Sequence, residues 1–232
     1  MLEQELQWEK GLFFFLNGSD SVFWDYFFWI YSCIPTWIPF YLSLIFVFMY
    51  KKKWKEIGWI LLSVLLVFAL TDQISSAFFK PVFHRFRPTW HSDFKDLVDT
   101  VFGYRGGKYG FISGHAANSF GLATFTALVF RKRLFTGVVL LFAIFNAYSR
   151  IYLGVHFISD VVTGALVGAI LGYLGYLFYN GGRVRFFHIN KEDLKKPVFP
   201  AWEIHVPCLV YATTVIILLL FNSQIINLLG KQ

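Results

Sequence analysis

Residues 149–179, SRIYLGVHFISDVVTGALVGAILGYLGYLFY, join a short polar cluster to a long apolar segment. The cluster contains Ser149, Arg150, His156 and Asp160. The segment that follows, 157–179, has the length of about 20 residues that a membrane-spanning helix requires. Gly164, Gly168 and Gly172 recur every fourth residue within it and place small side chains along one helix face. This stretch therefore predicts a spanning helix that packs closely on a neighbour and carries polar groups at its N-terminal end.

The composition of the whole chain is that of an integral membrane protein. Of 232 residues, 56% are hydrophobic, 21% are aromatic and only 15% are charged. We expect an all-α, polytopic transmembrane bundle with about six spanning helices, in the segments 22–50, 57–79, 114–130, 134–148, 157–179 and 206–229. The chain has no internal repeat and no soluble module long enough to fold alone, so residues 1–232 are interpreted as one domain.

The segment 22–50 is longer than one span and is interrupted by Pro35 and Pro39. It is either one kinked helix or a short helix followed by a full span, and we favour the second arrangement. Residues 1–10 carry three glutamates and precede only six apolar residues, which is unlike a cleaved signal and predicts an interfacial helix. Cys33 and Cys208 lie in separate apolar stretches and are interpreted as small core residues.

The basic residues indicate how the bundle is oriented. Most of them lie in three connecting loops, within 51–55, 131–133 and 183–196. Alternating spans place these loops on one side, which the positive-inside rule identifies as the cytoplasm. The net charge of +7 is explained in this way, and we expect no nucleic-acid partner. The opposite helix ends, which carry Lys80, Ser113 and Arg150, then face outward together.

His156 and Asp160 are four residues apart at the start of a helix, so their side chains lie on one face. A carboxylate there can fix the imidazole tautomer and leave the second ring nitrogen free as a nucleophile. The simpler alternative is a helix-end histidine beside a solvated aspartate. Arg150, at the exit of the preceding span, favours the catalytic interpretation, because a charge at membrane depth is costly unless it faces a polar site.

The two other clusters supply groups suited to an anion. Ser113-Gly114-His115 opens a helix, whose N-terminal N–H groups attract an oxyanion, although Ser113 also serves as an ordinary N-cap. His115 at this position can protonate a leaving oxygen. Lys80 and Arg87 add two cations, and a guanidinium binds phosphate oxygens in a bidentate fork. Together these groups suit a transferring phosphoryl group, whose charge spreads over three oxygens.

The full pattern, Lys80-x6-Arg87-Pro88, Ser113-Gly114-His115 and Ser149-Arg150-x5-His156-x3-Asp160, resembles the signature of the type 2 phosphatidic acid phosphatase (PAP2) superfamily in order and spacing. The resemblance covers about 57–179. It implies a metal-independent phosphatase without a cofactor, in which His156 attacks phosphorus, Asp160 orients it and His115 protonates the departing lipid oxygen. A phosphohistidine would follow, which water then hydrolyses. The phosphate oxygens would be held by Lys80, Arg87, Ser113, Gly114 and Arg150.

The chain departs from the family at Ile112, where proline usually precedes Ser-Gly-His, and proline there would stiffen the turn without supplying a reacting atom. The polar segment 81–112 is expected to lie over the external mouth of the site. Within it, the basic, aromatic and glycine-rich stretch 104–110 either touches a headgroup or second phosphate or is an ordinary mobile loop. Asp72 is either a partner of the cationic site or a hydrogen-bonding group between helices.

Two other functions use similar residues. An anion channel or transporter would also place cations at helix ends, but it gains nothing from an oriented nucleophile and a separate acid. A lipid phosphotransferase would share every residue and differ only in its acceptor. We expect a lipid phosphatase in a bacterial inner membrane with its site facing the periplasm or exterior. Its substrate is undecaprenyl diphosphate, phosphatidylglycerophosphate or a lipid A phosphate, and the oligomeric state is left open.

Overall fold

The computed structural model describes the chain except residues 1–6, 94, 191, 196–197, 200–201 and 231–232. Its described part is helical, with one isolated β-bridge between Phe86 and Tyr109. The α-helices are α2 (Gln7–Leu16), α3 (Val22–Ser32), α4 (Ile38–Met49), α5 (Trp54–Gln73), α6 (Lys80–Phe83), α7 (Gly114–Phe130), α8 (Arg133–Tyr152), α9 (Ile158–Phe187) and α10 (His205–Leu228). A π-helical segment, Ile74–Phe79, joins α5 to α6. Short 3₁₀ helices cover Ile34–Trp37, Pro88–Trp90, Lys95–Leu97, Val101–Gly103 and Asp193–Lys195.

Within the described residues, four helices are long and apolar enough to cross a membrane: Trp54–Phe83, Arg133–Tyr152, Ile158–Phe187 and His205–Leu228. The pair α3 and α4 adds a fifth span if the two are counted together. The sixth expected segment forms α7, which has only 17 residues and is not among them. The expectation of a polytopic helical protein is confirmed, and the count of six spans stays a prediction.

The segment 22–50 differs from the arrangement that we favoured. Its two helical pieces, Val22–Ser32 and Ile34–Met49, are bent by 72° at a break after Ser32, and the second piece begins with the 3₁₀ turn Ile34–Trp37. The 3₁₀ turn of 4 residues and α4 of 12 residues together stay below the roughly 17–25 residues that a spanning helix needs. A short helix followed by a full span is therefore the wrong description, and the pair forms one broken segment. Pro35 and Pro39 stand at the start of the two pieces after the break, where proline is tolerated.

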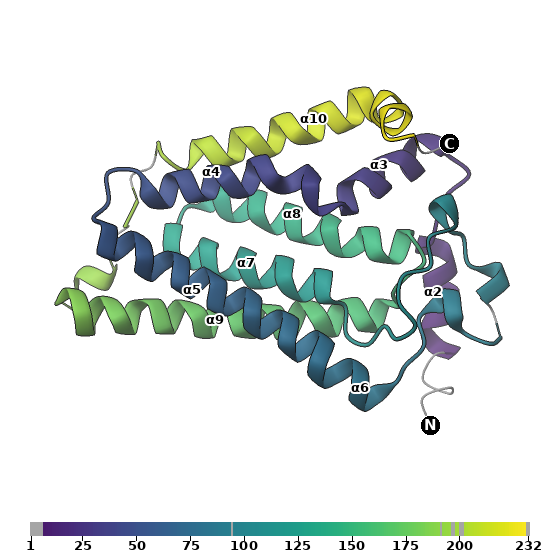
Figure 1. Ribbon diagram of the computed structural model, residues 1–232, viewed down its shortest axis with the longest axis horizontal. Helices are drawn as coiled ribbons and strands as arrows, with labels where there is room; N and C mark the ends of the chain where they lie inside the picture. The colour runs from purple at the N-terminus through teal and green to yellow at the C-terminus, as the bar shows by residue number, and fades with distance from the viewer. Residues whose placement is uncertain (1–6, 94, 191, 196–197, 200–201, 231–232) are drawn as a thin grey trace.

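The centre of the bundle is the contact between α7 and α9, which the glycine repeat predicts (Figure 1). A Cβ placed on Gly164 would lie 2.6 Å from the carbonyl oxygen of Ser113. Gly168 and Gly172 meet the backbone of Ala117 and Gly121 in the same way, one and two turns further on. The absence of side chains on α9 thus lets the two backbones approach, and it brings the N-terminus of α7 against the first turns of α9.

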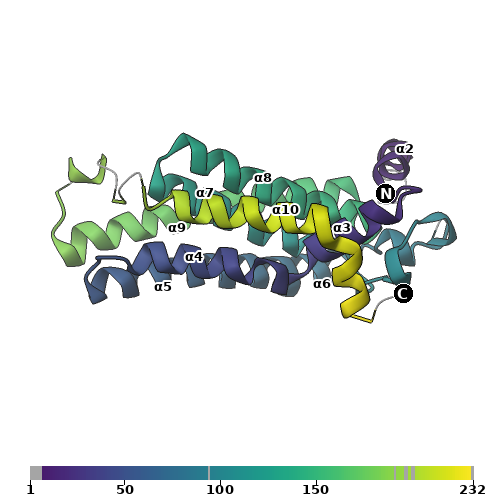
Figure 2. The same ribbon diagram turned by 90° about the horizontal axis from the view of Figure 1, so that it is seen from above.

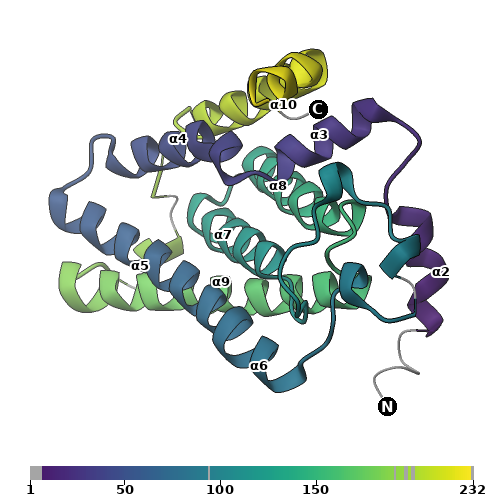
Figure 3. The ribbon, with the colours of Figure 1, turned by 45° about the vertical axis from the view of Figure 1, so that its right-hand side comes forward.

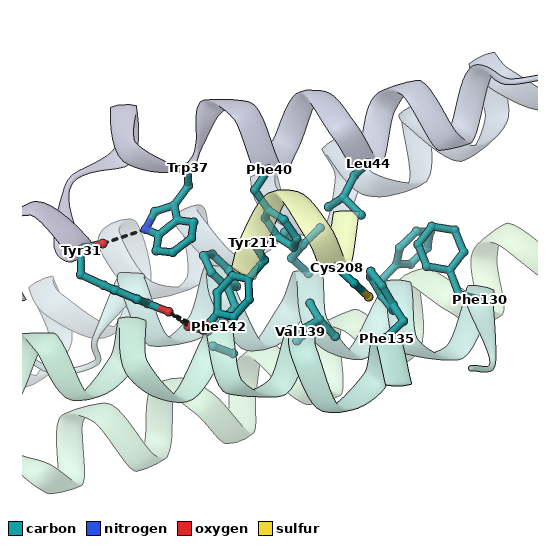
Figure 4. Close-up of a cluster of buried hydrophobic side chains, with 14 of the residues drawn as sticks. Tyr31, Trp37, Phe40, Leu44, Phe130, Phe135, Val139, Phe142, Cys208 and Tyr211 are labelled. Atoms are coloured by element: carbon teal, nitrogen blue, oxygen red, sulfur yellow. Dashed lines mark hydrogen bonds between the residues drawn. The ribbon is translucent and has the colours of Figure 1, made fainter. Parts of the chain in front are cut away.

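A second packing centre is aromatic and joins α3, α4, α8 and α10 (Figure 4). Trp37 is almost fully buried and donates its indole N–H to the carbonyl oxygen of Tyr31 at 2.7 Å. The hydroxyls of Tyr31 and Tyr211 lie 3.1 Å apart, so the polar tips of these rings have partners inside the core. Cys208 is buried in this cluster, in agreement with its interpretation as a small core residue. Cys33 is half-buried, and its thiol donates to the carbonyl oxygen of Trp29 at 3.3 Å.

The two ends of the bundle differ in what they carry. The connections α4–α5, α7–α8 and α9–α10, which hold the basic loops, lie together at one end (Figure 1). The segment 84–112, the connection between α8 and α9, and helix α2 lie at the other end (Figures 1 and 2). Helix α2 stands across the bundle axis there, beside the loop (Figure 3). The interfacial helix was expected over residues 1–10, and the described residues of that stretch form the start of α2.

Candidate active site

The three clusters predicted from the sequence come together at the end of the bundle that α2 and the segment 84–112 cover. Each group sits where a regular element begins or ends. Lys80 opens α6, Arg87 precedes the 3₁₀ turn Pro88–Trp90, Ser113 is the N-cap of α7, Arg150 lies in the last turn of α8, His156 lies in the α8–α9 connection, and Asp160 lies in the first turn of α9. Helix ends rather than helix faces therefore build the site.

His156 and Asp160 form the expected pair in a fully buried position. His156 Nδ1 lies 3.5 Å from Asp160 Oδ2, and the two side chains are 2% and 0% exposed. His156 Nδ1 has no hydrogen-bond partner among the described residues, so the ring contacts the carboxylate without a bond at this atom. Oδ2 instead accepts the backbone N–H of Phe157 at 3.0 Å, which fixes the carboxylate beneath the ring.

The protonation state of His156 follows from its surroundings. Burial, and then the positive charges of Arg87, Arg150 and Lys80, lower the pKa of His156 well below its usual value of 6.5. The imidazole is therefore neutral at physiological pH and keeps a free lone pair. A neutral ring surrounded by three cations suits attack on an anionic phosphorus centre.

Two buried arginines place positive charge beside His156. Arg87 is 9% exposed, and its guanidinium donates from Nε to the carbonyl oxygen of Tyr109 at 3.2 Å. Arg150 is 3% exposed, and its Nε has no hydrogen-bond partner among the described residues. The ring of Tyr104 lies 5.7 Å from the Arg150 guanidinium, and its hydroxyl accepts from Nη2 at 3.4 Å. A buried guanidinium with an unused donor fits an anion as its partner.

The N-terminus of α7 provides backbone donors beside these cations. Ser113 is fully buried, and its hydroxyl accepts the N–H of Ala116 at 3.5 Å, so it caps the helix as the simpler interpretation requires. Its own N–H donates to the carbonyl oxygen of Asp160 at 3.0 Å, which ties the second cluster to the third. His115 is half-buried and interacts electrostatically with His156 and Arg150. The acid and the nucleophile that the sequence predicts therefore lie at one site.

Lys80, at the N-terminal side of the first cluster, is less buried than Arg87 and makes weaker contacts. Lys80 is half-exposed and lies 3.5 Å from the hydroxyl of Ser76, at the edge of hydrogen bonding. Asp72 is exposed and interacts with Lys80 electrostatically, which agrees with a partner of the cationic site. Ser149, whose role the motif left open, donates its hydroxyl to the carbonyl oxygen of Asn146 at 2.7 Å inside α8. Its contact is internal to the helix.

The segment 104–110 lies directly on the buried cations. The N–H of Arg87 donates to the carbonyl oxygen of Lys108, and Thr89 donates to that of Arg105 at 2.8 Å, so the segment is paired with the first cluster. A Cβ on Gly106 would lie 2.7 Å from Arg87 Nη1, and a Cβ on Gly110 would lie 3.1 Å from Asp160 Oδ2. These two glycines therefore allow the loop to close over the guanidinium and the carboxylate.

Sequence reasoning missed two residues that the structure adds to the site. Arg85 donates from Nη1 to Asp160 Oδ1 at 2.7 Å and pairs through Nη2 with Glu9 of α2 at 2.5 Å. Arg85 lies in the segment 81–112, which was expected only to cover the mouth of the site, and its position two residues before Arg87 was the available signal. Glu9 had no signal of its own, because its partner is 76 residues away in the chain.

A cavity of about 240 Å³ lies inside the bundle beside His115, the one residue of the predicted site among those lining it. His115, Asn118, Ser119 and Asn146 give it a polar wall, and aromatic side chains of α4 and α5 face them. It continues into an apolar groove of about 290 Å³ between α4 and α5, with which it shares Tyr41, Phe68 and Leu122. The proposed acid therefore lines the polar end of a path that becomes hydrophobic at bundle depth.

The chain is similar to one protein family, to three phosphatases and to one solved structure. The family model of the PAP2 superfamily matches residues 57–183. Lipid A 4'-phosphatase of Porphyromonas gingivalis is 46% identical over 79% of this chain and 78% of its own length, and that of Bacteroides thetaiotaomicron is 40% identical over 74% and 75%. Phosphatidylglycerophosphatase B of Bacillus subtilis is 31% identical over 55% and 60%. The crystal structure of Aquifex aeolicus LpxE matches with a TM-score of 0.54 at 28% identity, covering 72% of this chain and 93% of that one.

Proposed function

The chain belongs to the PAP2 superfamily of phosphatases, and from the geometry of its site we propose that it releases phosphate from a membrane lipid through a phosphohistidine on His156. The observation that carries the proposal is the buried His156–Asp160 pair, which lies among buried arginines at the N-terminus of α7. The two relatives matched over 78% and 75% of their own length are lipid A 4'-phosphatases, so a lipid A phosphate is the first substrate proposed. Phosphatidylglycerophosphate is the second, and undecaprenyl diphosphate is the third.

In the first step, the neutral His156 attacks phosphorus through Nε2 while Asp160 faces Nδ1 and favours the imidazolium that forms. The bond between phosphorus and the lipid oxygen breaks as the new N–P bond forms. Burial and the positive charge of Arg150 disfavour the protonated form of His115, so we infer that it takes up its proton once the anionic phosphate lies beside it. It then donates this proton to the departing oxygen, and a neutral lipid alcohol leaves. Arg87, Arg150 and the N–H groups at the start of α7 stabilise the charge on the three equatorial oxygens, with Lys80 at the open edge.

In the second step, water attacks the phosphohistidine. His115, which lost its proton in the first step, removes one from the water, and the N–P bond breaks. The products are inorganic phosphate and the neutral imidazole of His156. The cations that bound the phosphoryl group in the first step hold the same oxygens in the second, so the protein needs no rearrangement between them.

The path from His115 into the bundle supports a lipid as the substrate. With its phosphate bound at the arginines, the substrate would direct its ester oxygen toward His115. The rest of the molecule would enter the cavity between α4, α5 and α7. The groove beyond it is lined by apolar side chains such as Leu44, Val64 and Leu65, which suits an acyl chain. A soluble phosphate ester gains no contacts there.

The charge distribution supports an external site. The basic connections lie at the end of the bundle opposite His156, and the positive-inside rule assigns that basic end to the cytoplasm. We therefore propose a multi-pass protein of a bacterial inner membrane whose single domain opens its site to the periplasm or exterior. A membrane-impermeant cysteine reagent tests this orientation with Lys108→Cys in the loop and Lys132→Cys at the other end, in a background with Cys33 and Cys208 replaced by alanine.

The activity is tested with the purified protein in detergent. Phosphate release is measured from a lipid A preparation, phosphatidylglycerophosphate and undecaprenyl diphosphate, without added metal. We expect release from at least the first of these, loss of release in His156→Ala, and an acid-labile, base-stable phosphoryl label on the wild-type protein only. Full activity of a folded His156→Ala variant would refute the mechanism. Appearance of the phosphate on an added lipid alcohol, rather than in solution, would identify a phosphotransferase instead.

A further inference from the structure

A buried chain of charged groups connects the N-terminal helix to the proposed nucleophile. Glu9 Oε1 pairs with Arg85 Nη2 at 2.5 Å, Arg85 Nη1 pairs with Asp160 Oδ1 at 2.7 Å, and Asp160 Oδ2 faces His156 Nδ1. Their side chains are 1%, 9%, 0% and 2% exposed in the order Glu9, Arg85, Asp160 and His156. The two oxygens of Asp160 therefore have different partners, one on each side.

Glu9 also holds the backbone of α9 directly. Its Oε2 accepts the N–H of Ser159 at 2.9 Å, and its Oε1 accepts the hydroxyl of Ser159 at 2.8 Å. Ser159 immediately precedes Asp160, and the Ser159 hydroxyl is in turn 2.6 Å from Arg85 Nη1. A single carboxylate from α2 thus satisfies a free N–H in the first turn of the catalytic helix, where negative charge is favoured.

The guanidinium of Arg85 is fixed by more than its two ion pairs. The ring of Phe157 lies 4.8 Å from Arg85 Cζ, and that of Phe111 lies 5.8 Å away. The carbonyl oxygen of Arg85 accepts the N–H of Gly110 at 2.9 Å. Aromatic rings near a planar cation restrict its tilt, while the two carboxylates set its position within its own plane. The Arg85 side chain is therefore a rigid link between Glu9 and Asp160.

We propose that Glu9 is a positioning residue of the active site, which acts through Arg85 and Ser159 on Asp160 and so on His156. The proposal rests on the function proposed above and adds helix α2 to the site. Residues 57–183 match the family model and contain the whole motif, whereas Glu9 lies well before them. The chain therefore uses an element outside the matched region to hold the carboxylate that orients its nucleophile.

The physical reason is the balance of charge around Asp160. A buried carboxylate needs a cation, and Arg85 supplies it. Arg85 in turn would draw Asp160 away from His156 if Asp160 were its sole anionic partner. Glu9 on the opposite side of the guanidinium shares that attraction, so Asp160 can hold its place beneath the ring with Oδ2 directed at Nδ1.

The test compares variants that remove the charge of Glu9 or shorten its reach. Glu9→Gln keeps the size of the side chain but not its charge, and Glu9→Asp keeps the charge on a shorter stem. Asp20→Asn is the matched control, because Asp20 is an exposed carboxylate in the connection between α2 and α3. Turnover of the soluble monoester p-nitrophenyl phosphate is measured per folded molecule, with the folded fraction taken from gel filtration. This substrate keeps the comparison valid whatever lipid the wild-type protein prefers.

We expect Glu9→Gln to lower kcat about tenfold or more while KM changes less than about twofold, because misplacement of a reacting group costs rate rather than binding. Inhibition by orthovanadate, which adopts the geometry of the attacked phosphoryl group, should weaken in parallel, and inhibition by inorganic phosphate should not. Glu9→Asp should recover part of kcat, and Asp20→Asn should match the wild type.

Wild-type kcat in folded Glu9→Gln would overturn the proposal, and so would a loss that appears in KM alone. A loss of folded protein with normal turnover in the molecules that remain would show a structural role only, which also contradicts it. If Glu9→Gln does not fold, Glu9→Asp decides: a reduced kcat with unchanged KM supports the positioning role, and wild-type kcat rejects it. If wild-type protein hydrolyses the monoester but no lipid phosphate, the lipid substrate proposed above fails while these comparisons still stand.

Discussion

The close approach of Gly164 in α9 to the backbone of Ser113 in α7 predicts the effect of adding one methyl group at position 164. Gly164 lies one turn after Asp160 on α9, and a Cβ at this position would be 2.6 Å from the carbonyl oxygen of Ser113 and 3.3 Å from the backbone nitrogen of Ser113. Ordinary contacts of this kind begin at 3.4 Å. In Gly164→Ala the N-terminus of α7 must therefore move away from α9 by roughly 0.5–1 Å. The movement stretches the hydrogen bond from Ser113 N–H to the carbonyl oxygen of Asp160.

Two opposing terms set the size of the effect on stability. Overpacking a tight contact costs about 1–3 kcal/mol, and replacing glycine by alanine inside a helix returns up to about 1 kcal/mol. We expect Gly164→Ala to lose about 0–2 kcal/mol of folding free energy. The effect on rate is larger, because a displacement of about 1 Å of a group in the active site can cost on the order of 100-fold. A fall in kcat of about ten- to a hundredfold is expected.

Gly181 provides the matched control, because it lies on the same helix and a Cβ there would have nothing within 4 Å. Gly181→Ala should keep wild-type kcat and unfold at the same or a slightly higher temperature. Both variants are compared by phosphate release and by thermal unfolding in the same detergent. Equal kcat for Gly164→Ala and Gly181→Ala would refute the argument that the α7–α9 contact sets the geometry of the site. If lowering the temperature alone restored the full rate of Gly164→Ala, the loss would come from unfolding and not from a displaced site, and the argument would fail as well.

Three further predictions concern charge at the site. The pKa of His156 in the folded protein lies below its unfolded value of 6.5, so the unfolded chain binds the additional proton. The free energy of unfolding should therefore fall as the pH is lowered through about 6.5, by up to about 1.4 kcal/mol per pH unit. Thermal unfolding between pH 8 and 5 measures this slope, which should be smaller in His156→Gln. Arg150→Lys should lower kcat/KM about ten- to a hundredfold in a steady-state assay, because an ammonium group cannot reproduce the two-pronged hydrogen bonding of a guanidinium. Tyr104→Phe keeps the ring beside Arg150 and should lower kcat/KM less than about threefold in the same assay. Treatment with EDTA should leave phosphate release unchanged, and a loss that added Mg²⁺ or Zn²⁺ restores would contradict the proposed mechanism.

The parts of the site that the sequence predicts are those whose geometry is local or follows from topology. The spacing of His156 and Asp160 fixes their common helix face, and the structure places them 3.5 Å apart. Convergence of the three clusters required only that spans alternate and that the basic loops share one end. The glycine repeat predicted a close helix partner, and α7 is that partner. Each of these inferences depends on a period or a spacing, which a sequence displays directly.

The broken segment 22–50 shows where such reasoning stops. Hydropathy counts apolar residues and does not give their direction, so we expected a short helix followed by a full span. The structure instead has α3 with 11 residues and α4 with 12, in two pieces that are bent against each other. Proline marks a break without fixing its angle, and the observed 72° depends on what packs in the bend. Trp37 stands there, with its N–H bonded to Tyr31 and its ring buried against Phe142 of α8. The angle is a tertiary property of contacts that lie far apart in the chain.

Glu9 illustrates the same limit for charge. A glutamate in a short amphipathic helix is interpreted as part of a solvated face, because an unpaired buried carboxylate is costly and most such residues are exposed. That interpretation reverses once a cation and a free N–H lie within reach, and here both come from segments far along the chain, Arg85 and Ser159. A buried polar network of this kind stabilises the fold when its donors and acceptors have partners, and each unpaired group in it is costly. It follows that α2 and the loop carrying Arg85 must dock together, since either one without the other leaves a charge buried beside Asp160.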